Sequence, residues 1–197
     1  MATESTFVAV ARSLIAEDLR GHRLDIRQGA VLLYQVTVDN NLRIMSEAQV
    51  RAPRRGDSAF QTDLCLFEQM SEEVWLPRVV LEFKTTITTH DVLTYSAKAT
   101  KHKQVYPYLR YGLVAENEKN VPGRFFTHNE GMDFCLSLRG LSDQESIAAF
   151  RRLLREELEC SRLLERVAFG GCESRLFRSQ IVLDNALQPC APGDAAR

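Results

Sequence analysis

The sequence lacks a long apolar run, which would indicate a membrane protein, and a large excess of basic residues, which would indicate binding to a polyanion. It contains no apolar run near the roughly 18 residues that a membrane-spanning helix needs. The apolar stretch at residues 7–11 is too short for a signal peptide, so we expect a cytoplasmic protein. The 25 Lys and Arg residues nearly balance the 26 Asp and Glu residues, which leaves a net charge of −1. Contact with nucleic acid would therefore depend on local basic patches.

Signatures of several common protein classes are also missing. The five cysteines are odd in number and include no CxxC pair, so we expect free thiols and neither a disulfide framework nor a zinc ribbon. No GxxxxGK, GxGxxG or GxSxG motif occurs, which removes the usual signs of nucleotide hydrolysis, dinucleotide binding and esterase chemistry. His128-Asn129-Glu130 resembles a fragment of an HNH motif, but no histidine stands at metal-binding spacing from it.

The hydrophobic pattern predicts alternating helices and strands in the first two thirds of the chain. Residues 5–20 have apolar positions at helical spacing. The β-branched residues that follow, with turn residues at 39–41, indicate a hairpin of strands 30–38 and 42–51. Further predicted elements are strands at 59–68 and 78–87 with a linker at 69–77, a helix from 88 or 89 to about 106, where Pro107 ends it, and a strand at 111–115.

The last third of the chain predicts a hairpin and a long helix. Strands at 124–128 and 132–138 would flank a turn with Gly131. Residues 142–145 form a capping-box pattern that opens a helix with apolar positions up to Val167, closed by Gly170-Gly171. A final strand is predicted at 177–183 and a disordered tail at 188–197. We expect a single α/β domain over residues 1–187, with a mixed central β-sheet flanked by helices.

Three charged residues stand out against this framework. The apolar run 78–81 leads into Glu82 and Lys84, which point to one face of the strand while Phe83 points to the other. If the preceding strand pairs alongside, Asp63 approaches Glu82. Two carboxylates in such proximity repel each other unless a cation lies between them, and Mg²⁺ prefers oxygen ligands. The structural alternative is a strand-end salt bridge between Glu82 and Lys84, with Asp63 as an acid in a turn.

The combination of Asp63, Glu82-x-Lys84 at the end of an apolar strand, and a following helix with Gln104 resembles the PD-(D/E)XK nuclease superfamily. The resemblance implies a restriction-endonuclease-like core with the order helix, three strands, helix, strand. It also implies that Asp63, Glu82 and the Phe83 carbonyl hold Mg²⁺, with Mn²⁺ able to substitute. Lys84 would position the attacking water or help to deprotonate it. Thr62 stands where the family name has proline.

A third carboxylate often completes such sites, and two candidates remain open. Glu47 lies on the preceding predicted strand at a spacing seen in type I restriction enzymes, and Glu17 lies on the first helix, the place used by resolvases. We prefer Glu47, although either acid could be a solvated surface residue. Asp57 is a weaker rival of Asp63 because it lies in a glycine-containing loop.

Basic residues on the following helix are candidates for contacts with DNA. Lys98, Lys101 and Lys103 accompany Gln104, which with Tyr108 matches the Q-x-x-x-Y motif of exonuclease-type members of the superfamily. Pro107 interrupts that motif. Arg54 and Arg55, with Arg51, form a second candidate clamp on the phosphate backbone. For both groups the alternative is an ordinary solvated basic face.

These patterns predict a Mg²⁺-dependent DNA endonuclease, by analogy a type II restriction endonuclease acting on double-stranded DNA. We expect a homodimer, because the long helix at 142–167 offers more apolar surface than one short sheet covers. The alternatives are a structure-specific repair nuclease or exonuclease of the same fold, and a non-catalytic binding or assembly module.

Overall fold

A five-stranded mixed sheet forms the centre of the computed structural model, which describes residues 3–19, 22–45, 50–55, 58–116, 120–171 and 173. Its order is β1-β6-β7-β8-β9. The strands are β1 (Leu24–Gln28), β6 (Leu64–Gln69), β7 (Trp75–Lys84), β8 (Arg110–Glu116) and β9 (Phe134–Leu138). The pairs β1–β6 and β6–β7 are antiparallel, whereas β7–β8 and β8–β9 are parallel. The predicted α/β class with a mixed central sheet is thereby confirmed.

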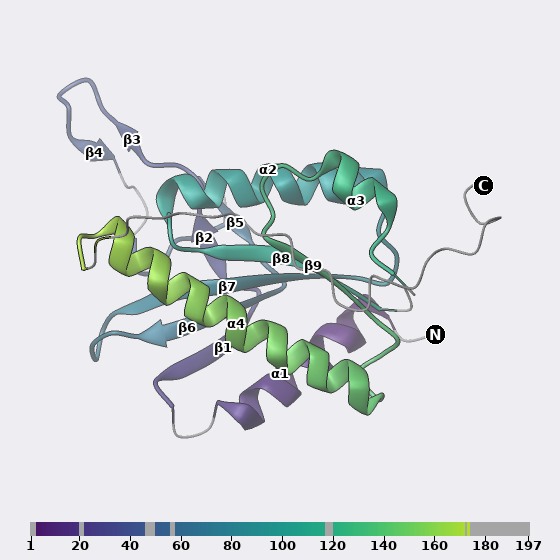
Figure 1. Cartoon of the computed structure of the whole chain (residues 1–197). Coiled ribbons are helices and arrows are strands. Elements are labelled where there is room, and N and C mark those ends of the chain that lie inside the picture. The colour runs from purple at the N-terminus through teal and green to yellow at the C-terminus, as the bar shows by residue number, and fades with distance from the viewer. Residues whose placement is uncertain are drawn as a thin grey trace.

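Helices cover both faces of this sheet (Figure 1). The helices α1 (Glu4–Asp18) and α4 (Gln144–Ala168) pack on one face, where Phe7, Phe83 and Phe150 belong to the same buried cluster. The other face carries α2 (Thr89–Val105) and α3 (Gly123–His128), and its buried cluster includes Val92 and Tyr111. Side chains therefore alternate along β7 as predicted, with Phe83 facing α1 and α4.

Two short additional sheets lie between β1 and β6 in the chain. The strands β2 (Val31–Leu33) and β5 (Ala59–Gln61) pair with each other, and β3 (Thr37–Val38) and β4 (Ile44–Met45) form the hairpin that projects from the body in Figure 1. The predicted strand at 59–68 thus breaks at Thr62 and Asp63 into β5 and β6. Thr62 is buried, and both its backbone N–H and its hydroxyl donate to the Ala30 carbonyl. Proline could not donate that backbone hydrogen bond.

The predicted hairpin at 124–128 and 132–138 is wrong. Residues 123–128 form α3, which begins after Pro122, and β9 runs parallel to β8. Parallel neighbours need a crossover connection, and α3 lies in that crossover. The Asn129 side chain closes the intervening turn through hydrogen bonds with the Met132 backbone.

Smaller differences concern the ends of elements. The strand β1 has no counterpart among the predicted elements, and β7 begins at Trp75, inside the predicted linker. Among the described residues of the hairpin arm predicted at 42–51, the two residues of β4 are extended, and Val50 and Arg51 lie in a turn. The cap of α4 is Asp143, whose carboxylate accepts from the Ser146 N–H.

Several predictions fall on residues outside the described ranges. These are the strand at 177–183, the tail at 188–197, and the candidate acids Glu47 and Asp57. Within the described part of the chain, Cys65 and Cys160 are free thiols. None of the helices described there combines the length and the apolar character that crossing a membrane requires.

Candidate functional site

The end of β7 and the start of β6 bring Asp63 and Glu82 together. In the antiparallel register Leu64 pairs with Leu81, so the two acids occupy the adjacent positions. Each carboxylate accepts a hydrogen bond from the neighbouring strand's backbone: the Phe83 N–H donates to Asp63 Oδ2 at 2.8 Å, and the Asp63 N–H donates to Glu82 Oε2 at 3.3 Å. These two bonds fix both side chains, and the structure juxtaposes the two acids as the sequence predicts.

Glu82 is the more deeply placed acid, with an exposed fraction of 2%. The Tyr111 hydroxyl, on the neighbouring strand β8, donates to Glu82 Oε1 at 2.5 Å. Burial, followed by the negative charge of Asp63, raises the pKa of Glu82 to about 7, although the bond from Tyr111 and the charge of Lys98 act in the opposite direction. The folded chain therefore holds a buried carboxyl that exchanges its proton near neutral pH, a property common at functional sites.

Lys84 follows on the same strand and pairs with the first turn of α1. Its Nζ lies 2.9 Å from Glu4 Oε1 and 3.1 Å from Oε2. Burial is the largest single influence and lowers the pKa of Lys84, but the hydrogen bonds and charges of Glu4 and Tyr95 together outweigh it, so the net pKa is raised. Lys84 is thus a fixed positive charge at neutral pH. The alternative of a Glu82–Lys84 salt bridge does not match this geometry, since the partner of Lys84 is Glu4.

Sequence reasoning did not select three residues that the fold brings to this site. Glu4 neutralises Lys84, Tyr111 holds Glu82, and the ring centroid of Tyr95 lies 5.5 Å from Lys84 Nζ. Their elements were predicted approximately, as the first helix, the helix after Lys84 and the next strand. No signal in the sequence indicated these contacts, because all three arise from packing between elements far apart in the chain.

Asp63 opens on a polar hollow of about 410 Å³, which also involves Glu4, Gln61 and Arg55. Arg55 is therefore the member of the predicted arginine clamp that lines the hollow, while Arg54 is exposed beside it in the chain. A ligand from solvent can therefore reach Asp63 through this hollow, on the side of α1.

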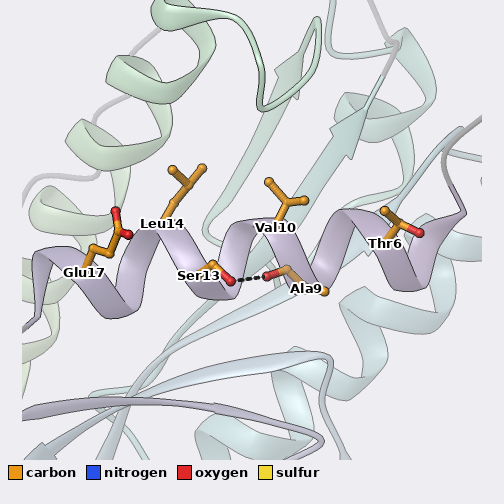
Figure 2. A pocket seen from close by; sticks show the side chains of 6 residues that line it. All are labelled: Thr6, Ala9, Val10, Ser13, Leu14 and Glu17. Atoms are coloured by element: carbon orange, nitrogen blue, oxygen red, sulfur yellow. Dashed lines mark hydrogen bonds between the residues drawn. The ribbon is translucent and has the colours of Figure 1, made fainter.

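The candidate acid Glu17 lies elsewhere. It sits at one end of a shallow, mostly apolar hollow lined by residues of α1 alone, including Val10 and Leu14 (Figure 2). Glu4 and Glu17 are on the same straight helix, separated by about 20 Å at 1.5 Å per residue. The acid of the first helix that reaches the site is consequently Glu4.

The basic residues predicted on α2 separate into two groups. Lys98 and Lys101 lie near aromatic rings on the side of β2 and β5. Lys103 points away to Asp133 and the Gly131 carbonyl, and its charge is neutralised there. Gln104 is exposed on the last turn, about 9 Å further along the axis than Lys98. The structure therefore does not bring Gln104 to the carboxylates.

Tyr108, the other residue of the Q-x-x-x-Y match, is buried against Arg78. The guanidinium carbon of Arg78 lies 5.4 Å from the Tyr108 ring centroid. Pro107 follows the end of α2, and Tyr106 caps the helix with its backbone N–H bonded to the His102 carbonyl. The Q-x-x-x-Y spacing thus spans a helix end and not one helical face.

The donor set fits magnesium. Mg²⁺ usually keeps several waters and binds proteins through one or two carboxylates. Asp63 and Glu82 supply two carboxylates whose repulsion a cation would relieve, and this repulsion contributes to the raised pKa of Glu82. The described ranges contain no group of three or more His, Cys, Asp or Glu side chains placed to hold a metal ion.

No protein-family model matches the chain, and no curated protein matches it in sequence.

Proposed function

We propose that this chain is a Mg²⁺-dependent deoxyribonuclease that hydrolyses phosphodiester bonds. The observation that carries the proposal is the reciprocal bonding of Asp63 and Glu82 to each other's strand, with Lys84 as a positive charge on the same face of β7. Two fixed carboxylates and an ammonium group suit an anionic substrate brought together with a divalent cation.

The order of elements around the site supports the proposal. When only the strands of the five-stranded sheet are counted, the order is helix α1, the antiparallel strands β1, β6 and β7, helix α2 and the parallel strand β8. This is the order helix, three strands, helix, strand that the PD-(D/E)XK resemblance implies; β2 to β5 are additions between β1 and β6. The paired acids stand at the break before β6 and near the end of β7, where the resemblance places its motif.

Each residue has a chemical role in this proposal. Asp63 and Glu82 would hold Mg²⁺, with the Phe83 carbonyl as a further ligand, and the ion would supply Lewis acidity and a more acidic bound water. Lys84 carries its proton at neutral pH and is ion-paired with Glu4, so it would orient the attacking water and would not act as a base. Tyr111 holds the Glu82 carboxylate in place.

Cleavage of plasmid, single-stranded and branched DNA tests the proposal. We expect the purified chain to cut DNA with Mg²⁺ and not with EDTA, and Asp63→Asn to lose at least about a hundredfold in rate, because metal-held charge stabilisation is lost. The amide oxygen of the substituted side chain can still accept from the Phe83 N–H, so the fold should survive. Asp25→Asn, on the edge strand β1, is the matched control and should cut normally. DNA left intact in every condition, or equal cleavage by Asp63→Asn, would overturn the proposal.

Two finer predictions belong to the same proposal. A type II restriction endonuclease would give discrete fragments, whereas a repair nuclease or exonuclease would act on ends or branches. The predicted homodimer would draw on exposed apolar residues at the end of α4 (Leu163, Val167 and Phe169). Light scattering tests it, and a monodisperse monomer at micromolar concentration would contradict it.

A further inference from the structure

Aromatic rings and lysines form a continuous strip leading away from the two carboxylates. We call it the aromatic strip and define it by Tyr34, Phe60, Tyr95, Lys98 and Lys101. It starts at Tyr95, whose ring is near Lys84, and continues through Lys98, whose Nζ lies 5.0 Å from the Tyr95 ring centroid and 5.7 Å from that of Phe60. Phe60 lies on β5, just before the break at Asp63. The strip therefore borders the proposed active site.

The centre of the strip is a stacked pair of rings. The centroids of Tyr34 and Phe60 are 4.1 Å apart, and their planes differ by 20°. Both residues are only partly buried, so part of the stack is accessible to solvent beside the two lysines that lie over the rings. The backbone behind it is held by the pairing of β2 with β5 and by the bond from the Tyr34 N–H to the Ser58 carbonyl. The rings thus form a rigid, half-open platform.

Lys98 and Lys101 place positive charge beside this platform. They are three residues apart on α2, on one side of the helix, and Lys101 Nζ lies 5.7 Å from the Tyr34 centroid. Neither forms an ion pair with a carboxylate in the described part of the chain, whereas Lys103 on the same helix is neutralised by Asp133. The two ammonium groups remain available for an anionic ligand.

We infer that the aromatic strip binds an unpaired nucleotide of the DNA strand that enters the site. This inference rests on the proposed nuclease function and specifies its substrate. Ring faces bind bases by stacking, and nearby lysines bind the flanking phosphates. A base within a duplex is already covered by its neighbours, so a stacking platform selects a strand end, a flap or a gap. The strip therefore favours the alternative of a structure-specific nuclease or exonuclease over a restriction enzyme.

Fluorescence anisotropy with a labelled oligothymidine, and with a duplex of the same length, tests the inference in EDTA so that no strand is cut. We expect Phe60→Leu and Tyr34→Leu to weaken oligothymidine binding about tenfold each, as loss of one stacked base predicts, and to change duplex binding less than about twofold. Lys98→Gln should weaken oligothymidine binding by a few fold. The matched control is Phe126→Leu, an exposed ring on α3, which should bind normally.

The outcomes separate this inference from the proposed function. Thermal unfolding of each variant first establishes that it is folded, and Lys98→Gln, which leaves the ring platform intact, keeps the test valid if a ring variant does not fold. Asp63→Asn should bind oligothymidine like the wild type but fail to cut it.

If the wild type cuts DNA but the ring and Lys98 variants bind oligothymidine as tightly as the wild type does, the inference about the aromatic strip is wrong and the proposed nuclease function stands. If the ring variants bind oligothymidine more weakly but the wild type cuts no DNA, the proposed nuclease function is wrong and the aromatic strip remains a nucleic-acid binding site. Equal losses for duplex and oligothymidine overturn the preference for unpaired bases.

Discussion

Glu82 couples proton binding to cation binding at the scale of a single side chain. Its pKa is raised to about 7 by burial and by Asp63, compared with 4.5 for an exposed glutamate. Between these two values the folded chain holds more protons than the unfolded chain. The contribution of Glu82 to stability without metal is therefore complete below pH 4.5 and is lost as the pH rises towards 7.

Metal affinity should show the opposite dependence on pH. Only the carboxylate form binds a cation, so protons compete with the metal below the pKa of Glu82. We expect Mn²⁺ affinity to fall about tenfold per pH unit below pH 7 and to level off above it. Isothermal titration calorimetry from about pH 6 to about pH 8.5 measures this, with Asp25→Asn as a control that retains the slope. An affinity that does not change with pH would show that Glu82 is not a ligand.

Prediction from sequence succeeded for residues whose pattern is local. The alternation along β7 placed Glu82 and Lys84 opposite Phe83, and the pairing of two strands placed Asp63 near Glu82. The candidates Glu17 and Gln104, which were chosen for their position on a helix, lie away from the two carboxylates. The distance of a helical residue from the site depends on how that helix docks, which the sequence pattern does not give. Glu4 and Tyr111 could be identified only from the docking itself.

At the scale of elements, helix α2 depends on a close approach to the loop before β9. The Ser96 hydroxyl accepts from the N–H groups of Glu130 and Gly131, and Lys103 donates to the Gly131 carbonyl. A Cβ at Gly131 would clash with the Ser96 carbonyl oxygen and with Thr100. Glycine therefore sets the position of the helix that presents Tyr95 and Lys98.

Replacing this glycine tests the dependence of α2 on the loop. We expect Gly131→Ala to lower the free energy of unfolding by about 1–3 kcal/mol, because backbone atoms of α2 cannot move aside cheaply. Gly123→Ala is the control, since nothing lies within 4 Å of the added methyl group. Urea unfolding of both variants gives the comparison, and equal stability would contradict the close approach.

Helix α4 is attached to the sheet by charge as well as by its apolar face. Arg78 of β7 is almost fully buried, and it donates to Glu68 of β6 at 2.8 Å and to Glu165 of α4 at 2.7 Å. Arg162 of α4 also donates to Glu68. This network fixes the end of α4 against the sheet, because an unpartnered buried guanidinium is costly.

Removing one member of the network should weaken the chain. We expect Glu165→Gln to cost about 2 kcal/mol in the free energy of unfolding, the value of a hydrogen bond to a charged group. Glu159→Gln removes an exposed partner of Arg162 and should change stability by less than about 0.5 kcal/mol. Chemical denaturation compares the two, and similar losses would show that Arg78 does not depend on Glu165.

Elements that a local sequence pattern determines were predicted well, and elements that depend on the pairing of distant strands were predicted poorly. The helices α1, α2 and α4 follow from apolar spacing and capping residues. The segment at 124–128 was assigned to a hairpin because Gly131 suggested a tight turn. Its helical form follows from the parallel pairing of β8 and β9, a long-range fact that no local pattern reports.

For the whole molecule, a net charge of −1 limits how strongly phosphates can be bound. If Lys98 and Lys101 make the main phosphate contacts, log K for single-stranded DNA should fall with log salt at a slope of about −1.4. Anisotropy titrations from about 50 to about 200 mM salt measure the slope. A slope steeper than about −3 would indicate a larger basic surface than the aromatic strip supplies.

The position of the acid pair at the open end of the β6–β7 hairpin has a kinetic consequence. These strands are joined by the turn at 70–74. Because closing a short loop costs the least entropy, we expect pairing to proceed from that turn towards Leu64 and Leu81, so that Asp63 and Glu82 meet last. Their repulsion therefore opposes the completion of folding and not its nucleation. An interaction formed after the transition state changes the rate of unfolding and leaves the rate of folding almost unaltered. A bound cation would thus lengthen the lifetime of the folded chain without making it fold faster.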